Sequence, residues 1–254
     1  MRLTVLNDNT AGKCCAEHGL SLLIEDGKKI LFDVGPSAIF LRNSKKLNVN
    51  LDETDTIVLS HGHWDHGNGL KFIKSKKLIC HPGCFIKRYR KKDDSYIGLP
   101  ISIDEAKKNF KLVLTKKPYE VTENIIFLGE IPRANDFESK TTTFYKEGKE
   151  DDFVMDDSAL AIKSKKGLIV IAGCSYAGIC NIVEYAKKIG KVYAVIGGFH
   201  LKEVDEITLK TIDYFKKEKI KLIYPCHCVD EIVLLKFEQV LGSKRLHSGD
   251  VIDF

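Results

Sequence analysis

The chain has 254 residues, of which 44% are hydrophobic and 30% charged, a balance that excludes disordered and fibrous proteins. Forty basic against thirty-five acidic side chains give a net charge of +5, which is only mildly basic. The longest uncharged apolar run, from Leu168 to Tyr176, has nine residues, whereas a membrane-spanning helix needs about 20. The first residues, Met1–Asp8, become polar before a signal-peptide core could form. We therefore expect a cytoplasmic protein that does not enter a membrane.

Eight cysteines in such a chain predict reduced thiols or metal ligands before disulfides. No two of them are spaced Cys-x-x-Cys, the arrangement on which zinc ribbons and conventional iron–sulfur sites rely. Both of these kinds of site are therefore disfavoured.

Short apolar and β-branched runs dominate the first half of the chain and predict strands. These strands are expected at Leu3–Leu6, Leu20–Glu25, Ile30–Asp33, Thr56–Ser60, Leu78–Cys80, Leu112–Leu114 and Ile125–Leu128. The dipeptide Asp26-Gly27 is typical of a hairpin turn between the second and third of them. A helix is expected between Pro36 and Leu47.

Two stretches lack a clear apolar period. Residues 86–110 are polar and basic, which predicts a loop-rich insertion with a short helix from Ile103. Residues 132–157 predict a long loop. Residues 71–92 carry nine Lys and Arg residues and no acid, which indicates either a solvated helix face with a loop or an electropositive rim that steers an anionic substrate.

Strands and helices alternate in the second half. The strands are expected at Ala159–Ile162, Leu168–Ala172, Val192–Ile196 and Leu222–Tyr224. The helices are expected around the apolar stripe Ile179, Ile182, Val183 and Ala186, around Leu209, Ile212 and Phe215, and over Glu231–Leu241 before Gly242. This alternation predicts an α/β fold in which helices cover sheets.

The segment that follows the strand Thr56–Ser60 carries the strongest chemical signal. His61, His63, Asp65 and His66 fall within six residues. If strand geometry persists, His61 and His63 point the same way and can share one cation. The turn that follows would let Asp65 and His66 face the same place. Imidazole together with carboxylate suits Zn²⁺, Fe or Mn rather than Ca²⁺ or Mg²⁺.

The pattern His61-x-His63-x-Asp65-His66 after a strand resembles the signature of the metallo-β-lactamase superfamily. The resemblance extends over most of the chain. It implies an α/β fold of the αββα four-layer sandwich type, with one or two metal ions held between the sheet edges. Residues 1–254 would then form a single domain.

The same resemblance implies roles for residues outside this pattern. Asp33 would support the metal-binding loop from behind, without contacting the metal. Cys174 stands where the superfamily has a metal-bridging aspartate, and it is either a thiolate ligand or a buried packing residue. His227 stands where the last histidine ligand follows a strand. Its neighbours Cys226 and Cys228 are interpreted as packing residues.

Several segments resemble one subgroup, whose namesake is the archaeal dihydropterin–ribofuranosylaminobenzene-phosphate synthase. These segments are Glu17–Ser21, Gly129–Arg133, Gly173–Ile179, Gly197–Leu201 and Pro225–Cys228. Most members with this motif set are described only as metal-dependent hydrolases. The subgroup typically reads Gly-Cys-Ser-His where this chain has Tyr176, which implies a lost or altered metal contact and a phenol facing the substrate. A single tightly held ion, or iron in preference to zinc, becomes more plausible.

Three further candidates follow glycine or proline turns. His200 could bind metal, contact the substrate or shuttle a proton. Arg133 is either an anion clamp for the substrate or an ordinary surface residue. His81 could line the pocket, whereas His18 and His247 are interpreted as structural.

These residues together predict a metal-dependent hydrolase in which a metal-activated water attacks a small anionic, phosphorylated substrate. Asp65 would orient the water or accept its proton, and His200 would assist. The cofactor would be one or two divalent ions, Zn or Fe, with Mn as a further option. The alternatives are a pterin-linked transferase, a metal-dependent redox protein and a noncatalytic metal-binding protein. We expect no nucleic-acid partner, and self-association is left open.

Overall fold

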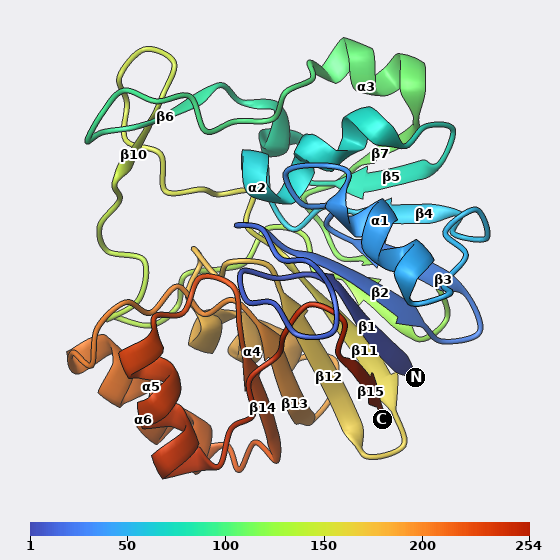
Figure 1. The fold of residues 1–254 in the computed structure, drawn as a ribbon. Coiled ribbons are helices and arrows are strands. Elements are labelled where there is room, and N and C mark those ends of the chain that lie inside the picture. The colour runs from blue at the N-terminus through green and yellow to red at the C-terminus, as the bar shows by residue number, and fades with distance from the viewer.

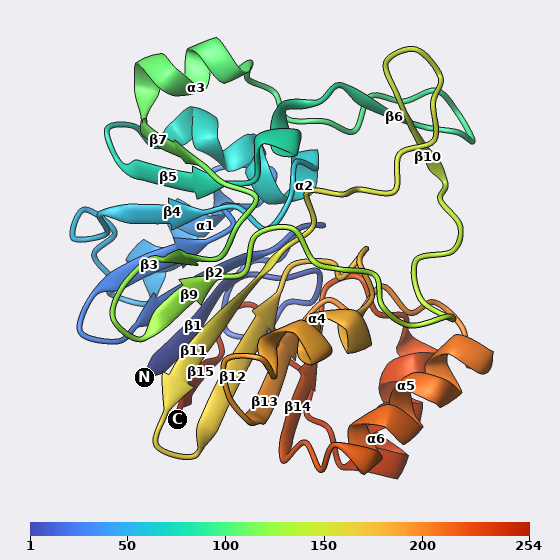
Figure 2. The ribbon, with the colours of Figure 1, turned by 180° about the vertical axis from the view of Figure 1, so that it is seen from behind.

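The computed structural model describes residues 1–254 and contains two large β-sheets packed face to face (Figure 1, Figure 2). The first sheet has, in spatial order, β15 (Val251–Asp253), β1 (Arg2–Asn7), β2 (Ser21–Glu25), β3 (Lys29–Phe32), β4 (Thr56–Val58), β5 (Lys77–Cys80) and β7 (Lys111–Leu114). The second has β14 (Leu222–Pro225), β13 (Val192–Gly197), β12 (Gly167–Ala172), β11 (Ala159–Ser164), β9 (Ile125–Phe127) and β8 (Tyr119–Glu120).

Helices cover the outer faces of both sheets. Helices α1 (Ile39–Lys46) and α3 (Ile103–Asn109) pack on the first sheet, and α4 (Ile179–Ala186), α5 (Glu206–Lys217) and α6 (Glu231–Leu241) pack on the second (Figure 2). This arrangement confirms the expected αββα four-layer sandwich. None of the helices combines the length and the hydropathy that a membrane span requires.

The alternation of side chains along the strands creates three apolar layers. In β12, Leu168, Val170 and Ala172 face the helices α4, α5 and α6. Ile169 and Ile171 point the other way, into a core of 20 buried residues between the two sheets. A third core lies between the first sheet and its helices. The intersheet core therefore fixes the position of one half of the chain against the other.

Parallel strand pairs bring the candidate ligands to one edge of the two sheets. Strands β3, β4, β5 and β7 run parallel, and so do β12, β13 and β14. The carboxyl ends of parallel strands meet at the same edge of a sheet, where open α/β sheets bind their ligands. The His61–His66 segment follows β4, Cys174 follows β12, and His227 follows β14.

An arm, formed by residues 86–98 and 140–152, projects from this edge (Figure 1). In it β6 (Arg88–Arg90) and β10 (Phe144–Lys146) pair antiparallel and form a separate two-stranded sheet. The prediction of an unbroken loop over 132–157 was wrong at β10. A three-residue strand shows too little periodicity to be recognised, and its pairing partner lies far away in the sequence.

Arg88 ties this arm to the sandwich. Its side chain is completely buried, and Nη2 donates to Asp156 Oδ1 at 2.7 Å and to the Gly83 carbonyl at 2.9 Å. Nε lies 3.2 Å from Asp152 Oδ2. The other Asp156 oxygen accepts the Gly62 N–H at 2.8 Å. Asp156 therefore links the Arg88 guanidinium to the backbone of Gly62, between His61 and His63.

The basic stretch 71–92 differs from the expected helix face. It forms no α-helix, but the 3₁₀ turns η1 (Asn68–Phe72) and η2 (Pro82–Phe85) together with β5 and β6. Within the arm, Lys87 pairs with Glu147 at 2.9 Å, and Lys91 pairs with Asp151. Because Arg88 is buried and these lysines are paired, this stretch presents less free positive charge than its composition suggests.

Asp157, the neighbour of Asp156, is buried with incomplete hydrogen bonding. Its Oδ2 accepts the Ala177 N–H at 2.9 Å, and its Oδ1 has no partner. Burial raises the pKa of this carboxyl to about 7. The folded protein therefore favours the protonated form of Asp157 up to near-neutral pH.

We predict that Arg88→Met lowers the free energy of unfolding by about 3–5 kcal/mol, because it leaves the buried carboxylates of Asp152 and Asp156 without a cation. Urea denaturation measures this change. Arg90→Met is the matched control: Arg90 is exposed and pairs with Asp93 at 3.4 Å, so its loss should cost less than about 1 kcal/mol. Equal stabilities of the two variants would contradict the burial of Arg88.

We predict that Asp157→Asn flattens the pH dependence of stability. The folded-state pKa of about 7 lies above the unfolded value, so the carboxyl favours folding below about pH 4, and this contribution disappears as pH rises through 7. Between these limits the free energy of unfolding of the metal-free wild type should fall with pH more steeply than that of the variant, by up to about 1.4 kcal/mol per pH unit. Parallel profiles would refute this.

Candidate metal centre

The motif after β4 turns sharply and gathers its side chains. A Cβ on Gly62 would lie 2.0 Å from a backbone carbonyl oxygen, so this position accepts only glycine. The short helix α2 (Trp64–Gly67) begins after His63 and brings Asp65 and His66 back toward His61. The ring centroid of His61 lies 4.6 Å from that of His63 and 4.3 Å from that of His66. All four predicted ligands of this motif are buried at one place.

Asp33 orients two of these ligands from behind. It follows β3 with a left-handed backbone (φ 57°), and its Oδ2 lies 2.6 Å from His66 Nδ1. The same oxygen accepts the Ser60 hydroxyl at 2.7 Å, and that hydroxyl lies 2.9 Å from His61 Nδ1. The Nδ1 atoms of both histidines are thus engaged, which leaves their Nε2 atoms for a ligand.

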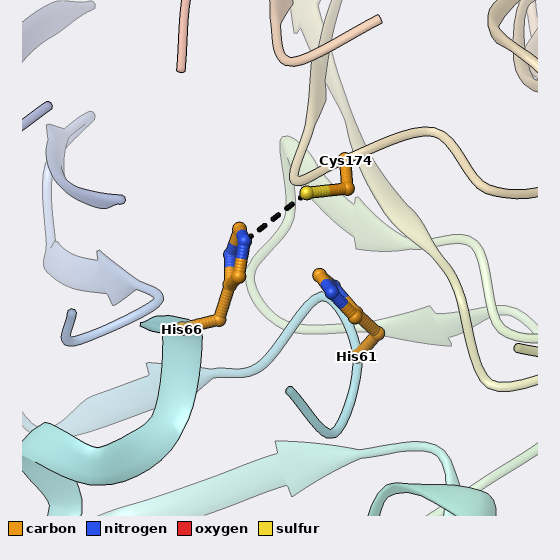
Figure 3. Close-up of side chains that lie close together, drawn as sticks. All are labelled: His61, His66 and Cys174. Carbon is orange, nitrogen blue, oxygen red and sulfur yellow. Dashed lines mark hydrogen bonds between the residues drawn. The ribbon is translucent and has the colours of Figure 1, made fainter. Parts of the chain in front are cut away.

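The second sheet supplies the facing residues. Cys174 Sγ lies 3.2 Å from His66 Nε2 (Figure 3), and His227 Nε2 lies 3.0 Å from the same nitrogen. Asp65 Oδ2 lies 3.5 Å from His227 Nε2 and 3.7 Å from His66 Nε2. Three groups have ligand atoms that lie within 4.8 Å of one another: His61, His66 and Cys174; Asp65, His66 and His227; and Cys174, His227 and Cys228.

The loop after β1 holds His227 in place. The His227 N–H donates to Asp8 Oδ1 at 2.8 Å, and its Nδ1 lies 3.0 Å from Asn9 Oδ1. As with His66, a partner behind the ring leaves Nε2 facing the centre. Asp8 and Asn9 were not among the residues predicted from the sequence, since their role depends on a contact between the two ends of the chain.

The charge states within this cluster differ sharply. Burial lowers the pKa of His63 to about 3 and that of His61 well below its usual value, so both are neutral. Burial acts the same way on His66, but the carboxylates of Asp65 and Asp33 outweigh it and raise the His66 pKa to about 9. A cation that binds here would replace the proton of His66.

Two buried nitrogens in the cluster have no hydrogen-bond partner: His61 Nε2 and His63 Nε2. Buried polar atoms without partners are rare and call for an explanation, such as an ion. Neutral imidazoles beside a carboxylate and a thiol form the donor set that zinc and iron prefer. These residues therefore fit a divalent metal.

Four of the eleven non-glycine residues with left-handed backbone lie at the same edge. Asp33, Ser175, His200 and His227 have φ values of 57°, 60°, 51° and 55°, and each lies just beyond the end of a strand. Left-handed backbone in non-glycine residues costs about 1 kcal/mol or more each and clusters at functional sites. The candidate ligand His227 and the supporting residue Asp33 are thus both held in a strained backbone conformation.

Tyr176 lies against the unpartnered histidines. Its ring centroid is 5.2 Å from that of His61 and 4.9 Å from that of His63. Burial raises the pKa of its phenol well above the usual value, so it stays protonated and is a poor metal ligand. The pair His61 and His63 thus has only a neutral phenol where relatives of the subgroup would offer a third imidazole.

A cavity of about 290 Å³ opens beside Tyr176. It is lined by apolar and polar side chains, including Lys140, Thr142, Phe144, Phe199, Tyr176 and His200. The ring of Phe144, from the arm, packs edge-on against that of His63, with the ring centroids 5.0 Å apart. The ring centroids of His200 and Tyr176 lie 4.4 Å apart, and the buried Nδ1 of His200 has no hydrogen-bond partner. The arm, through Phe144, and Tyr176 therefore lie between this cavity and the metal cluster, whose candidate ligands do not line the cavity themselves.

Arg133 lies behind the wall of this cavity. Its Nη2 donates to the carbonyls of Phe153 at 2.7 Å and Val154 at 3.2 Å, and its Nε donates to the Ser139 hydroxyl at 2.8 Å. These three residues line the cavity. Arg133 therefore supports the cavity wall through Nη2 and Nε, whereas its buried Nη1 has no hydrogen-bond partner.

His18, interpreted as structural, lies at the rim of the cluster. Its Nε2 is 3.3 Å from Asp65 Oδ2, and its side chain is 59% exposed. The His18 ring therefore connects the buried Asp65 carboxylate to solvent. Its ring is 5.5 Å from that of His227. The sequence did carry a signal, because Glu17-His18-Gly19 is one of the segments that resemble the subgroup. His81 instead pairs with Glu130 at 3.1 Å.

Comparisons with known proteins agree with this geometry. A family model described as "Metallo-beta-lactamase superfamily" matches residues 16–95. An uncharacterized protein of Methanocaldococcus jannaschii is 38% identical over 98% of this chain and 99% of its own length. The 7,8-dihydropterin-6-methyl-4-(beta-D-ribofuranosyl)-aminobenzene-5'-phosphate synthase of the same organism is 37% identical over 94% of this chain and 90% of its own length.

Among solved structures, a metal-dependent hydrolase of the beta-lactamase superfamily superposes with a TM-score of 0.90 at 28% identity. The match covers 100% of this chain and 99% of that one. Sequence and fold agree over essentially the whole length, and the chain belongs to the metallo-β-lactamase superfamily.

Proposed function

We propose that this protein is a metal-dependent hydrolase that acts on a small anionic substrate. The observation that carries the proposal is the buried, unpartnered Nε2 pair of His61 and His63, which lies next to the carboxylate–imidazole–thiol cluster and beside the cavity. A solved structure similar over its whole length is described as a metal-dependent hydrolase, which supports the reaction class.

Residues from both sheets would hold the metal. Asp65, His66 and His227 form one group, and His61, His66 and Cys174 form another that shares His66. His63 lies beside His61, and its buried Nε2 has no partner. A divalent cation in such a site supplies Lewis acidity and lowers the pKa of a coordinated water to roughly 7. The neutral state of His61 and His63 matches the form that binds a cation.

We assign Asp65 to orienting the attacking water, because its carboxylate can accept a hydrogen bond from the water O–H. Burial alone would raise its pKa, but the neighbouring imidazoles of His66 and His227 hold the pKa well below the usual range. The carboxylate is therefore charged at neutral pH. His18, within 3.3 Å of Asp65, provides a route from this carboxylate to solvent. His200, on the cavity wall, is placed to donate to the substrate or its leaving group.

The cavity wall itself supports an anionic substrate. Lys140, Thr141 and Thr143 line it and offer a cation and two hydroxyls, whereas the Thr142 hydroxyl donates to the Asp152 carbonyl. The Lys140 ammonium donates to the Asn135 carbonyl at 2.9 Å. The carboxylate that also lines it, Glu138, accepts the N–H groups of Cys180 and Asn181 at the start of α4 and so faces away from a substrate. We therefore propose Lys140, and not Arg133 or the stretch 71–92, as the anion-binding cation.

A synthase is the second candidate, because a relative 37% identical over 94% of this chain carries that name. In that reaction class the metal would organise two substrates without water as a reactant. Incubation with a dihydropterin and ribofuranosylaminobenzene phosphate, followed by mass spectrometry of the product, distinguishes the two. Product without hydrolysis would favour the synthase.

We predict that the metal-loaded protein cleaves bis(p-nitrophenyl) phosphate and that a chelator abolishes the cleavage. Asp65→Asn should lower kcat at least about 100-fold, because it removes the charged carboxylate that orients the water and belongs to one ligand group. Asp253→Asn, on an exposed strand far from the centre, is the matched control and should leave kcat unchanged. If metal-loaded protein turns over no activated ester, the hydrolase proposal fails.

We predict that Tyr176→His raises the number of metal ions bound per chain, because it adds an imidazole next to His61 and His63. Elemental analysis by mass spectrometry after dialysis measures this stoichiometry. Tyr176→Phe, which removes only the hydroxyl, should leave it as in the wild type. An unchanged metal content in Tyr176→His would show that the histidine pair needs no third imidazole.

A further inference from the structure

We propose that Cys228 is a metal ligand, so that the centre contains a site of two thiols and one imidazole from Cys174, Cys228 and His227. The sulfur and nitrogen atoms of these three residues all lie within 4.8 Å of one another, and all three residues are buried. In the sequence, Cys226 and Cys228 flank His227 symmetrically, and both were interpreted as packing residues. The structure makes the two cysteines different.

Cys226 points away from the centre. It belongs to the intersheet core, between apolar side chains such as Ile196 and Leu246. Cys228 belongs to none of the three apolar cores and lies against the loop after β12, with its sulfur 3.5 Å from the Cys174 carbonyl oxygen. Of the two cysteines that flank His227, only Cys228 has its sulfur beside the candidate ligands.

Gly198 leaves the space that the two thiols need. It follows β13, the strand between β12 and β14, and therefore lies between Cys174 and Cys228. A Cβ on Gly198 would stand 2.5 Å from Cys228 Sγ and 3.3 Å from Cys174 Cα. Any side chain here would push Cys228 away from its partners. Three adjacent parallel strands thus end in a thiol, a glycine and an imidazole–thiol pair.

This donor set has a chemical consequence. Two thiolates and an imidazole select thiophilic ions such as Zn²⁺ or Fe²⁺ and discriminate against Mg²⁺ and Ca²⁺. His61 shares a group with only one thiol, that of Cys174, and His63 belongs to no group that contains a thiol or a carboxylate. The first ion to bind should therefore occupy the thiol side of the centre. This inference requires that the protein binds metal, and it does not depend on which reaction the protein catalyses.

X-ray absorption at the zinc edge tests the proposal on the full-length, reduced protein loaded with one equivalent of Zn²⁺. The fine structure counts sulfur ligands directly, and we expect two in the wild type. Cys228→Ser and Cys174→Ser should each show one, and Cys226→Ser, the matched control, should keep two. A wild-type count of one or none overturns the proposal without relying on any variant.

Cobalt substitution gives a second readout. In the Co²⁺-loaded wild type the near-ultraviolet thiolate-to-cobalt charge-transfer band should report both sulfurs, and Cys228→Ser should lose about half of its intensity. Circular dichroism establishes that each variant is folded. A Cys228→Ser spectrum identical to that of the wild type, in a folded protein, would overturn the assignment of Cys228 as a ligand.

Discussion

The contact between His66 and His227 is the point on which the site depends. Their Nε2 atoms lie 3.0 Å apart, although one residue follows a strand of the first sheet and the other follows a strand of the second. Each sheet alone carries an incomplete set of ligands. The 20 buried residues between the sheets determine how the two sets meet. Metal binding and intersheet packing should therefore stabilise each other, since a ligand that binds only the folded state favours folding.

The cluster is costly for the metal-free protein. It buries two imidazoles whose pKa values shift in opposite directions: that of His66 is raised to about 9, and that of His63 is lowered to about 3. It leaves two ring nitrogens without partners and holds several strand ends in left-handed backbone. A divalent ion would satisfy the nitrogens and displace the proton of His66. The strain and the unsatisfied atoms are best understood as the preparation of a binding site.

The sequence predicted the layers of the fold correctly, and the residues that it proposed as ligands lie close together in the structure, for a clear reason. The β12 alternation and the apolar stripe around Ile179 are local patterns, and the His61–His66 motif is contiguous. The arm was missed because β6 and β10 are short and pair across a long stretch of sequence. The burial of Arg88 was missed because its partners, Asp152 and Asp156, lie in a segment without a recognisable pattern.

The same limit applies to Cys228 and His18. Their positions follow from which strand lies next to which, and no spacing within the chain reports that. The central claim, that two sheet edges build one metal centre, is tested most directly by diffraction from crystals of the purified protein on both sides of the zinc and iron absorption edges. We predict an anomalous peak between His66, Cys174 and His227. The absence of a peak there in metal-supplemented crystals, or a peak only elsewhere on the protein, would contradict the account.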